Sequence, residues 1–183
     1  QPLPTSNNIS ALGRHFQKII MPLWQSNGWN PTLRLPYESL GSVNGLPLPA
    51  TYYRAMACAR QLYIFSHEGT SGSPIAARAD ELFASLLLYF SDSQGGWIYS
   101  VDAAGRPFDE TQDLYTYAFI IFACAEYYKK SGNQSALQVM LQTIDLVEQL
   151  FADRNGLYVS ALGKDFVGIN SRTVQNPIMH LTE

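Results

Sequence analysis

Apolar residues recur every three or four positions in three long segments, at about residues 9–25, 74–90 and 135–151. This spacing gathers the apolar side chains on one face, which is typical of amphipathic helices whose opposite side is solvated. The third segment shows the pattern most clearly. Its apolar positions are Leu137, Leu141, Ile144, Val147, Leu150 and Phe151.

Cap and turn residues mark the limits of two of these helices. Ser135 stands where an N-cap of the third helix is expected, and Asn155-Gly156 predicts the turn that ends it. Pro22 is expected to kink or end the first helix near its last turn, because proline cannot donate a backbone hydrogen bond.

A second set of helical segments is apolar on most faces, at about residues 50–67 and 109–130 and from Asn176 onward. In the second of these, the run 117–125 leaves no polar side. A helix that is apolar all round is buried all round. Each unit is therefore expected to pair a half-exposed outer helix with a buried inner helix.

Three similar turn sequences mark a repeat. They are Asn27-Gly28-Trp29, Gly95-Gly96-Trp97 and Asn155-Gly156-Leu157. Their third residues lie 68 and then 60 positions apart (97 − 29 and 157 − 97), and residues 97–101 and 157–161 predict short strands. A period of roughly 64 residues with one helical hairpin favours a closed ring, an α/α toroid lined by the inner helices. Residues 1–183 would then be one domain of about two and a half hairpins, with an open helical bundle as the alternative.

Composition narrows the class of protein. Apolar residues make up 46% of the chain, enough for a sizeable core, and the net charge of -3 argues against nucleic-acid binding. No apolar run reaches the roughly 18 residues of a membrane span. Residues 1–4 lack the features of a signal peptide, so we expect a cytoplasmic protein. Cys58 and Cys124 fall in apolar helical patterns and are expected to be reduced core thiols. A half ring would expose apolar inner faces, so self-association, for example as a homodimer, is expected.

Few motifs for chemistry are present. The sequence contains no cluster with metal-ligand spacing, no G-x-S-x-G elbow and no glycine-rich phosphate loop before a helix. Polar groups on the inner helices remain. Arg60 could bind a substrate oxygen with its fork of N–H donors, or form a buried ion pair that holds the ring together. Tyr115 could offer its hydroxyl to a ligand or fill the core.

The third inner helix begins with two further polar groups. Asn176 and His180 are four residues apart and project from one face, with Asn176 as the cap and Pro177 in the first turn. His180 is either a satisfied core histidine or a functional group at the mouth of the ring. Asp109, Glu110 and Asp113 are expected to match the positive N-terminus of the second inner helix.

The other candidates favour structural roles. His15, on an outer helix, and His67, at an inner-helix end, are expected to be structural or solvated. Trp29 and Trp97 could stack on a sugar face, although packing of the hairpin turn is the favoured interpretation.

Four stretches, each weak alone, are specific in their order and spacing. They are Ala59-Arg60-Gln61-Leu62-Tyr63-Ile64-Phe65-Ser66; Gly95-Gly96-Trp97-Ile98-Tyr99-Ser100-Val101-Asp102 with Gly105-Arg106-Pro107; Asp113-Leu114-Tyr115-Thr116-Tyr117-Ala118-Phe119; and Asn176-Pro177-Ile178-Met179-His180-Leu181-Thr182-Glu183. Together they resemble the N-acylglucosamine 2-epimerase family, which also holds cellobiose 2-epimerases and mannose isomerases. The likeness covers nearly the whole chain but only the N-terminal half of the family's domain.

The resemblance implies an all-α fold, the N-terminal part of an (α/α)6 barrel with short hairpin-like strands in the connections and a central sugar pocket. It implies interconversion of sugars at C1 and C2 by proton transfer through an enediolate, without a redox cofactor or an obligatory metal. Histidines act as base and acid, which suits the near-neutral pKa of imidazole. By motif, Arg60 matches the arginine that stabilises the oxyanion. Tyr115, Asn176 and His180 match pocket residues that hold the sugar.

The family's two principal acid/base histidines lie in the C-terminal half, and no segment of this chain matches them. The resemblance therefore implies that His180 is a binder or helper, and that the 183-residue chain alone is inactive. Two alternatives come from other classes of protein. One is a carbohydrate-binding protein without turnover, and the other is a half-barrel that completes a ring with a partner chain.

Overall fold

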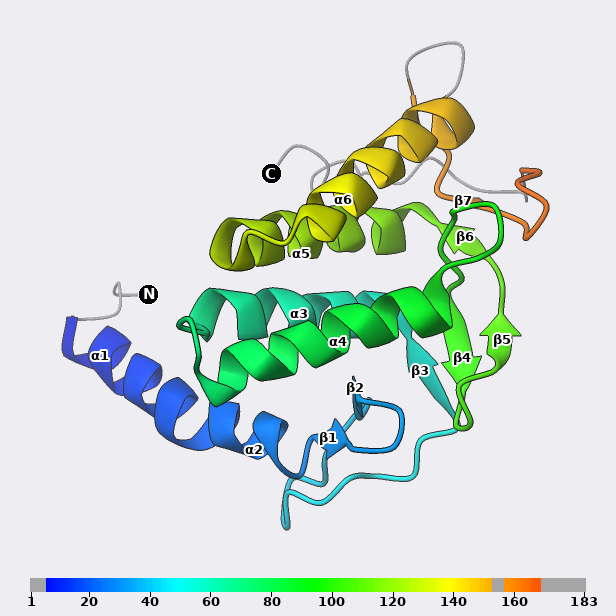
Figure 1. The fold of residues 1–183 in the computed structure, drawn as a ribbon. Helices are drawn as coiled ribbons and strands as arrows, with labels where there is room; N and C mark the ends of the chain where they lie inside the picture. Colours follow the sequence, from blue (N-terminus) through cyan, green and yellow to red (C-terminus); the bar gives the residue numbers. More distant parts are fainter. Residues whose placement is uncertain (1–5, 153–156, 169–183) are drawn as a thin grey trace.

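The computed structural model describes residues 6–152 and 157–168, and helices dominate it (Figure 1). The helical elements, with η for a π-helical turn, are α1 (Ser6–His15), η1 (Phe16–Ile20), α2 (Met21–Gln25), α3 (Ala55–Glu68), α4 (Pro74–Phe90), α5 (Leu114–Ser131), α6 (Gln134–Leu146) and η2 (Val147–Phe151). The three outer segments and the first two inner segments predicted from apolar spacing are all helical.

The helices form an inner and an outer row. Among the described elements, the inner helices α3 and α5 pack against each other most extensively. α4 packs against α3 and α6 packs against α5, so inner and outer helices alternate along the chain (Figure 1). No residue of the run 117–125 in α5 is exposed, which confirms the prediction of a helix without a polar side.

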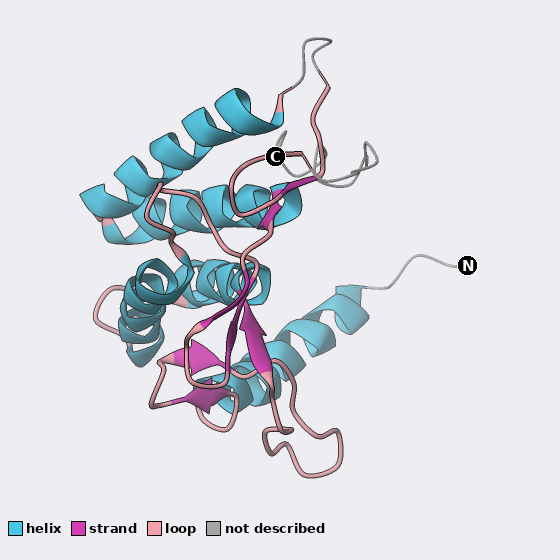
Figure 2. Ribbon diagram, turned by 90° about the vertical axis from the view of Figure 1, so that its right-hand side faces the viewer, coloured by secondary structure: helices cyan, strands magenta, loops and turns pink. Residues whose placement is uncertain are grey.

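Short antiparallel strands gather beside the N-terminal ends of the inner helices (Figures 1 and 2). They are β1 (Trp29–Asn30) with β2 (Leu35–Pro36), then β3 (Tyr52–Arg54), β4 (Ser100–Asp102) and β5 (Pro107–Asp109) in that order, and β6 (Gln112–Asp113) with β7 (Ala161–Leu162). The strands predicted at 97–101 and 157–161 begin later, at Ser100 and Ala161. Before them, Trp97 and Tyr158 form only isolated bridges with the residues that follow the outer helices.

Both inner helices begin five residues later than predicted. Residues ahead of α3 and α5 pair as strands β3 and β6 with segments far away in sequence, and this pairing keeps them extended. Asp109 lies on β5 and Glu110 in the connection after it, so neither lies at the helix N-terminus, contrary to the prediction. Asp113, which was also expected there, is the N-cap, and its Oδ2 accepts hydrogen bonds from the backbone N and the Oγ1 of Thr116, both at 2.8 Å. Its burial raises the pKa of Asp113 even though these bonds favour the charged form.

The limits of two outer helices also differ from the sequence expectation. The N-cap of α6 is Asn133, not Ser135, because the Asn133 Oδ1 accepts a hydrogen bond from the Ser135 backbone N at 2.9 Å. Pro22 does interrupt the first helix as predicted. A π-turn, η1, precedes it, and the Met21 backbone N donates to the Phe16 carbonyl, five residues back instead of four.

The two tryptophans of the repeated turns prove to be packing residues. Trp29 and Trp97 are 5% and 2% exposed, and the Trp97 Nε1 donates to the Thr143 Oγ1 at 3.1 Å. This arrangement confirms packing of the turn as the role of both indoles. Cys58 and Cys124 are buried and free, as predicted, and burial raises the pKa of both thiols, to about 12 for Cys124.

A buried polar network ties the connection before β4 to the start of α5. Gln112, which is 1% exposed, accepts hydrogen bonds at its Oε1 from the Trp97 backbone N at 3.0 Å and from the Tyr117 hydroxyl at 2.5 Å. Its Nε2 donates to the Asp92 Oδ2 at 3.1 Å. A Cβ at Gly96 would lie 2.6–2.7 Å from oxygens of Asp92, Gln112 and Tyr117. The absence of a side chain at Gly96 therefore makes room for this network.

Candidate functional site

Side chains of the two inner helices meet in three matched pairs. The α3 members are Arg60, Tyr63 and His67, and their α5 partners are Phe119, Phe122 and Glu126. On each helix these positions are three and four residues apart, so they share one face. Every pair is separated by 59 residues (119 − 60, 122 − 63 and 126 − 67). We call these six residues the inner-helix ladder. Its order shows that α3 and α5 run parallel, with equivalent positions of successive repeats in contact.

The first pair of the inner-helix ladder contains the candidate catalytic arginine. Arg60 is exposed, and its Cζ lies 4.8 Å from the centroid of the Phe119 ring. None of the ion pairs formed within residues 6–152 and 157–168 includes Arg60. The alternative prediction for Arg60 was a buried ion pair, and Arg60 forms no such pair among the described residues. The guanidinium keeps its positive charge at a surface of the inner helices.

Tyr115 lies beside this pair, in the first turn of α5. Its ring meets the ring of Phe119 edge-on, with centroids 5.0 Å apart and an interplanar angle of 80°. The tyrosine is partly exposed. The structure thus brings Arg60 and Tyr115 to the same ring, Phe119. Phe119 stands in one of the sequence motifs, but periodicity alone could not separate it from the core-filling aromatics around it.

The other two predicted site residues, Asn176 and His180, lie outside the described residues. Their roles stay predictions from the family resemblance. Among the residues that the structure describes, no group of three or more His, Cys, Asp or Glu side chains is arranged to hold a metal ion. Within the same residues, no helix combines the length and the apolar character that a membrane span requires.

The third pair of the inner-helix ladder is an ionic contact. The His67 Nδ1 lies 3.1 Å from the Glu126 Oε1, and the Lys129 Nζ donates to the Glu126 Oε2 at 3.3 Å. His67 also stacks on Tyr63, with ring centroids 5.8 Å apart. Burial by itself raises the pKa of Glu126, but the contacts with His67 and Lys129 outweigh it and hold the pKa below the ordinary 4.5. His67 therefore takes part in helix–helix contact, in keeping with the structural role expected for it.

We expect Glu126→Gln to lower the stability of the protein in a pH-dependent way. A carboxyl whose folded pKa is depressed stabilises the fold above its unfolded pKa, and this contribution is lost as the pH falls through the folded pKa. Because His67 and Lys129 are largely solvated, the loss near pH 7 should be only about 1 kcal/mol in the free energy of unfolding. The difference from the parent should shrink as the pH falls below 4.5, the ordinary pKa of this carboxyl. Urea unfolding at several pH values measures it.

Glu81→Gln is the matched control for this prediction. Glu81 pairs with Arg78 on the outer helix α4 and is 41% exposed, so its loss should change the free energy of unfolding by ~0.5 kcal/mol or less. If Glu126→Gln lowered the free energy of unfolding no more than Glu81→Gln does, the ionic contact would not stabilise the inner-helix interface.

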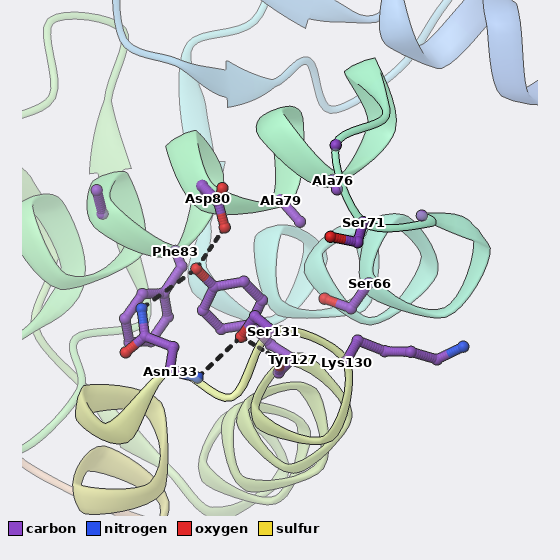
Figure 3. A pocket seen from close by; sticks show the side chains of 13 residues that line it. Ser66, Ser71, Ala76, Ala79, Asp80, Phe83, Tyr127, Lys130, Ser131 and Asn133 are labelled. Carbon is purple, nitrogen blue, oxygen red and sulfur yellow. Dashed lines mark hydrogen bonds between the residues drawn. The ribbon is translucent and has the colours of Figure 1, made fainter.

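A separate cavity of about 560 Å³ lies at the opposite end of the inner helices, between the start of α4 and the end of α5 (Figure 3). Its polar side chains bind one another. The Tyr127 hydroxyl donates to the Asp80 Oδ1 at 2.6 Å and accepts from the Asn133 Nδ2 at 3.4 Å. Burial and the nearby Asp80 carboxylate raise the pKa of Tyr127 to about 12. Neither Arg60 nor Tyr115 lines this cavity, so it is not the predicted sugar pocket.

Comparison with known sequences identifies related proteins. Residues 37–183 match the sequence model of the N-acylglucosamine 2-epimerase (GlcNAc 2-epimerase) family. Cellobiose 2-epimerase from Dictyoglomus turgidum is 25% identical over 149 residues, which are 77% of this chain and 36% of that protein. Cellobiose 2-epimerase from Eubacterium cellulosolvens is 28% identical over 116 residues, 57% of this chain and 28% of that protein.

Solved structures agree with the sequence comparison. Cellobiose 2-epimerase from Spirochaeta thermophila matches with a TM-score of 0.84 at 25% identity, over 97% of this chain and 49% of that one. A D-mannose isomerase matches with a TM-score of 0.84 at 21% identity, over 98% of this chain and 46% of that one, a likeness of fold alone.

The chain spans about half the length of these solved relatives and about a third of the two related sequences. The solved relatives are (α/α)6 barrels, so the predicted fold is confirmed: the chain forms the N-terminal part of such a barrel. The family model covers most of the sequence, and the alternating inner and outer helices agree with it. The chain therefore belongs to the N-acylglucosamine 2-epimerase family.

Proposed function

We propose that the full-length protein containing this chain is a sugar 2-epimerase or an aldose–ketose isomerase that works by proton transfer at C2. Membership of the family supports the class of reaction, and the matched cellobiose 2-epimerases and D-mannose isomerase illustrate its two variants. The single observation that carries the proposal to particular residues is the position of Arg60. It is an exposed cation on an inner helix, held over an aromatic ring and paired with no carboxylate among the described residues.

The proposed mechanism needs a cation at the carbonyl oxygen. A base removes the proton from C2, the C–H electron pair forms the C1–C2 double bond, and the C1 carbonyl oxygen becomes an enediolate oxyanion. Arg60 would donate N–H groups to this oxygen, and the charge that develops there would strengthen the interaction in the transition state. Return of the proton to the opposite face of C2 yields the epimer. Return of the proton to C1, with transfer of the O2 proton to O1 as the C2 carbonyl forms, yields the ketose.

The remaining roles follow the family motif. Tyr115 would donate its hydroxyl to the sugar, next to Arg60 across the Phe119 ring. Asn176 and His180, four residues apart, would hold the sugar from the third inner helix, with His180 as a helper. The principal base and acid are expected to be histidines of the barrel half that this chain does not match.

A second candidate function follows from the extent of the match. The chain covers only 46–49% of the solved relatives, so it could act as a half-barrel that binds carbohydrate without turnover or that completes a ring with a partner chain. An enzyme and a binding module differ in one measurable property, the exchange of the C2 hydrogen with solvent.

Incubation of the full-length protein in D2O with mannose, glucose, N-acetylmannosamine or cellobiose tests the proposal. A base that abstracts the C2 proton exchanges it with solvent, so the expected result is deuterium at C2 of an epimer or at C1 of a ketose, detected by NMR and mass spectrometry. The productive sugar also identifies the substrate. Binding of these sugars with no deuterium incorporation would favour the carbohydrate-binding alternative. If the protein showed neither binding nor exchange with these sugars, the result would exclude both the enzyme and the carbohydrate-binding function for them.

We expect His180→Ala to lower kcat/KM about 10- to 100-fold, the effect of losing one or two polar contacts to the substrate, without changing the melting temperature. Steady-state kinetics with the productive sugar measures it. His15→Ala is the matched control, because His15 lies on the outer helix α1 and should leave the kinetics unchanged. Equal kinetics for the two variants would remove His180 from the site.

A further inference from the structure

The Arg60 guanidinium presents two different surfaces to its surroundings. Its Cζ lies over the Phe119 ring, 4.8 Å from the centroid. Its N–H groups point outward from the edges of the plane, because all five donors lie in that plane. A cation–π contact through the face of a guanidinium leaves these edges for hydrogen bonds to a ligand.

Another arginine of this chain also contacts an aromatic ring, but its N–H groups are bound within the protein. Arg78 lies over the indole of Trp29, with its Cζ 4.4 Å from the ring centroid. Its Nη1 donates to Glu81 at 2.7 Å and its Nη2 donates to the Gln25 carbonyl at 3.4 Å. Those N–H groups are already used within the protein. Arg60 has the aromatic contact, and no carboxylate of the described residues offsets its charge.

Phe119 is well placed to fix the direction of this side chain. It is 8% exposed, lies in the second turn of the buried helix α5, and meets the ring of Tyr115 edge-on, with centroids 5.0 Å apart. An exposed arginine has many rotamers, and ordering it costs conformational entropy. A rigid ring beneath the guanidinium reduces that cost before the substrate arrives.

We propose that Phe119 is a positioning residue for Arg60: its ring holds the guanidinium plane so that the N–H edges face the sugar oxygen on which charge develops. The inference rests on the proposed function, since it assigns the device that orients the oxyanion-binding group of that same site. The ring itself makes no bond to the reacting atoms.

The test compares ring electronics with ring packing in the full-length enzyme. Phe119 is replaced by 4-fluoro- and 3,4,5-trifluorophenylalanine, which keep the shape of the ring and progressively weaken its negative face. The kcat should fall stepwise, to about 2- to 5-fold below the parent for the trifluoro variant, the change that corresponds to a cation–π contact of ~0.5–1 kcal/mol at an exposed site. Phe119→Leu, which removes the ring, should lower kcat at least as much. The KM should change less than kcat, because the loss falls on the transition state.

Phe122→Leu is the matched control, because it removes the ring of the next pair in the inner-helix ladder, which stacks on Tyr63 and not on Arg60. It should lower the melting temperature about as much as Phe119→Leu and leave kcat unchanged. In an Arg60→Ala background, Phe119→Leu should cause no further loss of kcat. Unchanged kcat in the trifluoro variant, or equal losses of kcat in Phe119→Leu and Phe122→Leu, would overturn the positioning role. An Arg60→Ala enzyme with full activity would instead contradict the proposed function itself.

Discussion

Arg60→Ala in the full-length protein is expected to lower kcat by about 100- to 1,000-fold, the loss typical of removing one donor to a developing oxyanion. The proposed reaction places negative charge on the C1 oxygen as the C2 proton leaves, and Arg60 is the exposed cation of the inner helices beside Tyr115. The fold should be little affected, because the side chain is exposed and forms no ion pair within the described residues. Steady-state kinetics and thermal melting together separate these effects.

Two further variants sharpen this experiment. Arg60→Lys keeps a positive charge but loses the planar fork and its stacking on Phe119, so kcat should fall between those of the parent and the alanine variant. Arg78→Ala removes an arginine of the outer helix α4 that lies over the ring of Trp29, and it should leave kcat unchanged. Full activity in Arg60→Ala would contradict the proposed role, as would equal losses in the variants at positions 60 and 78.

Gly96→Ala is expected to lower the free energy of unfolding by about 2–3 kcal/mol. The new Cβ would lie 2.6 Å from the Asp92 Oδ2 and 2.7 Å from both the Gln112 Oε1 and the Tyr117 hydroxyl. These atoms belong to one buried hydrogen-bonded network, so none can move without breaking a bond to another. Urea or thermal unfolding of the full-length protein measures the loss.

Gly13→Ala is the control for the change from glycine to alanine. A Cβ at Gly13 meets no atom within 4 Å, and the residue lies within α1, so the substitution should leave stability unchanged or raise it by up to ~1 kcal/mol. If Gly96→Ala changed the free energy of unfolding no more than Gly13→Ala, the predicted clash of a Cβ at residue 96 with the buried oxygens would be wrong.

Helical periodicity predicted the inner and outer helices because apolar spacing along one helix is a local property. It misplaced their beginnings for a physical reason. The five residues ahead of α3 and of α5 have no local feature that keeps them extended; their pairing partners on β4 and β7 are distant in sequence. The cap of α6 was missed by two residues because serine and asparagine both suit an N-cap. Only the hydrogen bonds of Asn133 distinguish them.

The candidate site was likewise predictable in part from the sequence, and in part only from the tertiary structure. Motif order was enough to single out Arg60 and Tyr115, and the family match bears out the resemblance from which they came. The contact between Arg60 and Phe119 could not be predicted, because it depends on how α3 and α5 are aligned along each other. A shift of one residue in that alignment would place other side chains opposite Arg60.

The sequence by itself determined the alternation of buried and half-exposed helices, the repeat and the family, because each is carried by residue types at fixed spacing. The tertiary structure alone decided what each polar group touches. It placed Arg60 on an aromatic ring, His67 against Glu126, and Gly96 in the space between three buried oxygens. These contacts join residues up to 59 positions apart, and only the packing of one helical hairpin against the next brings them together.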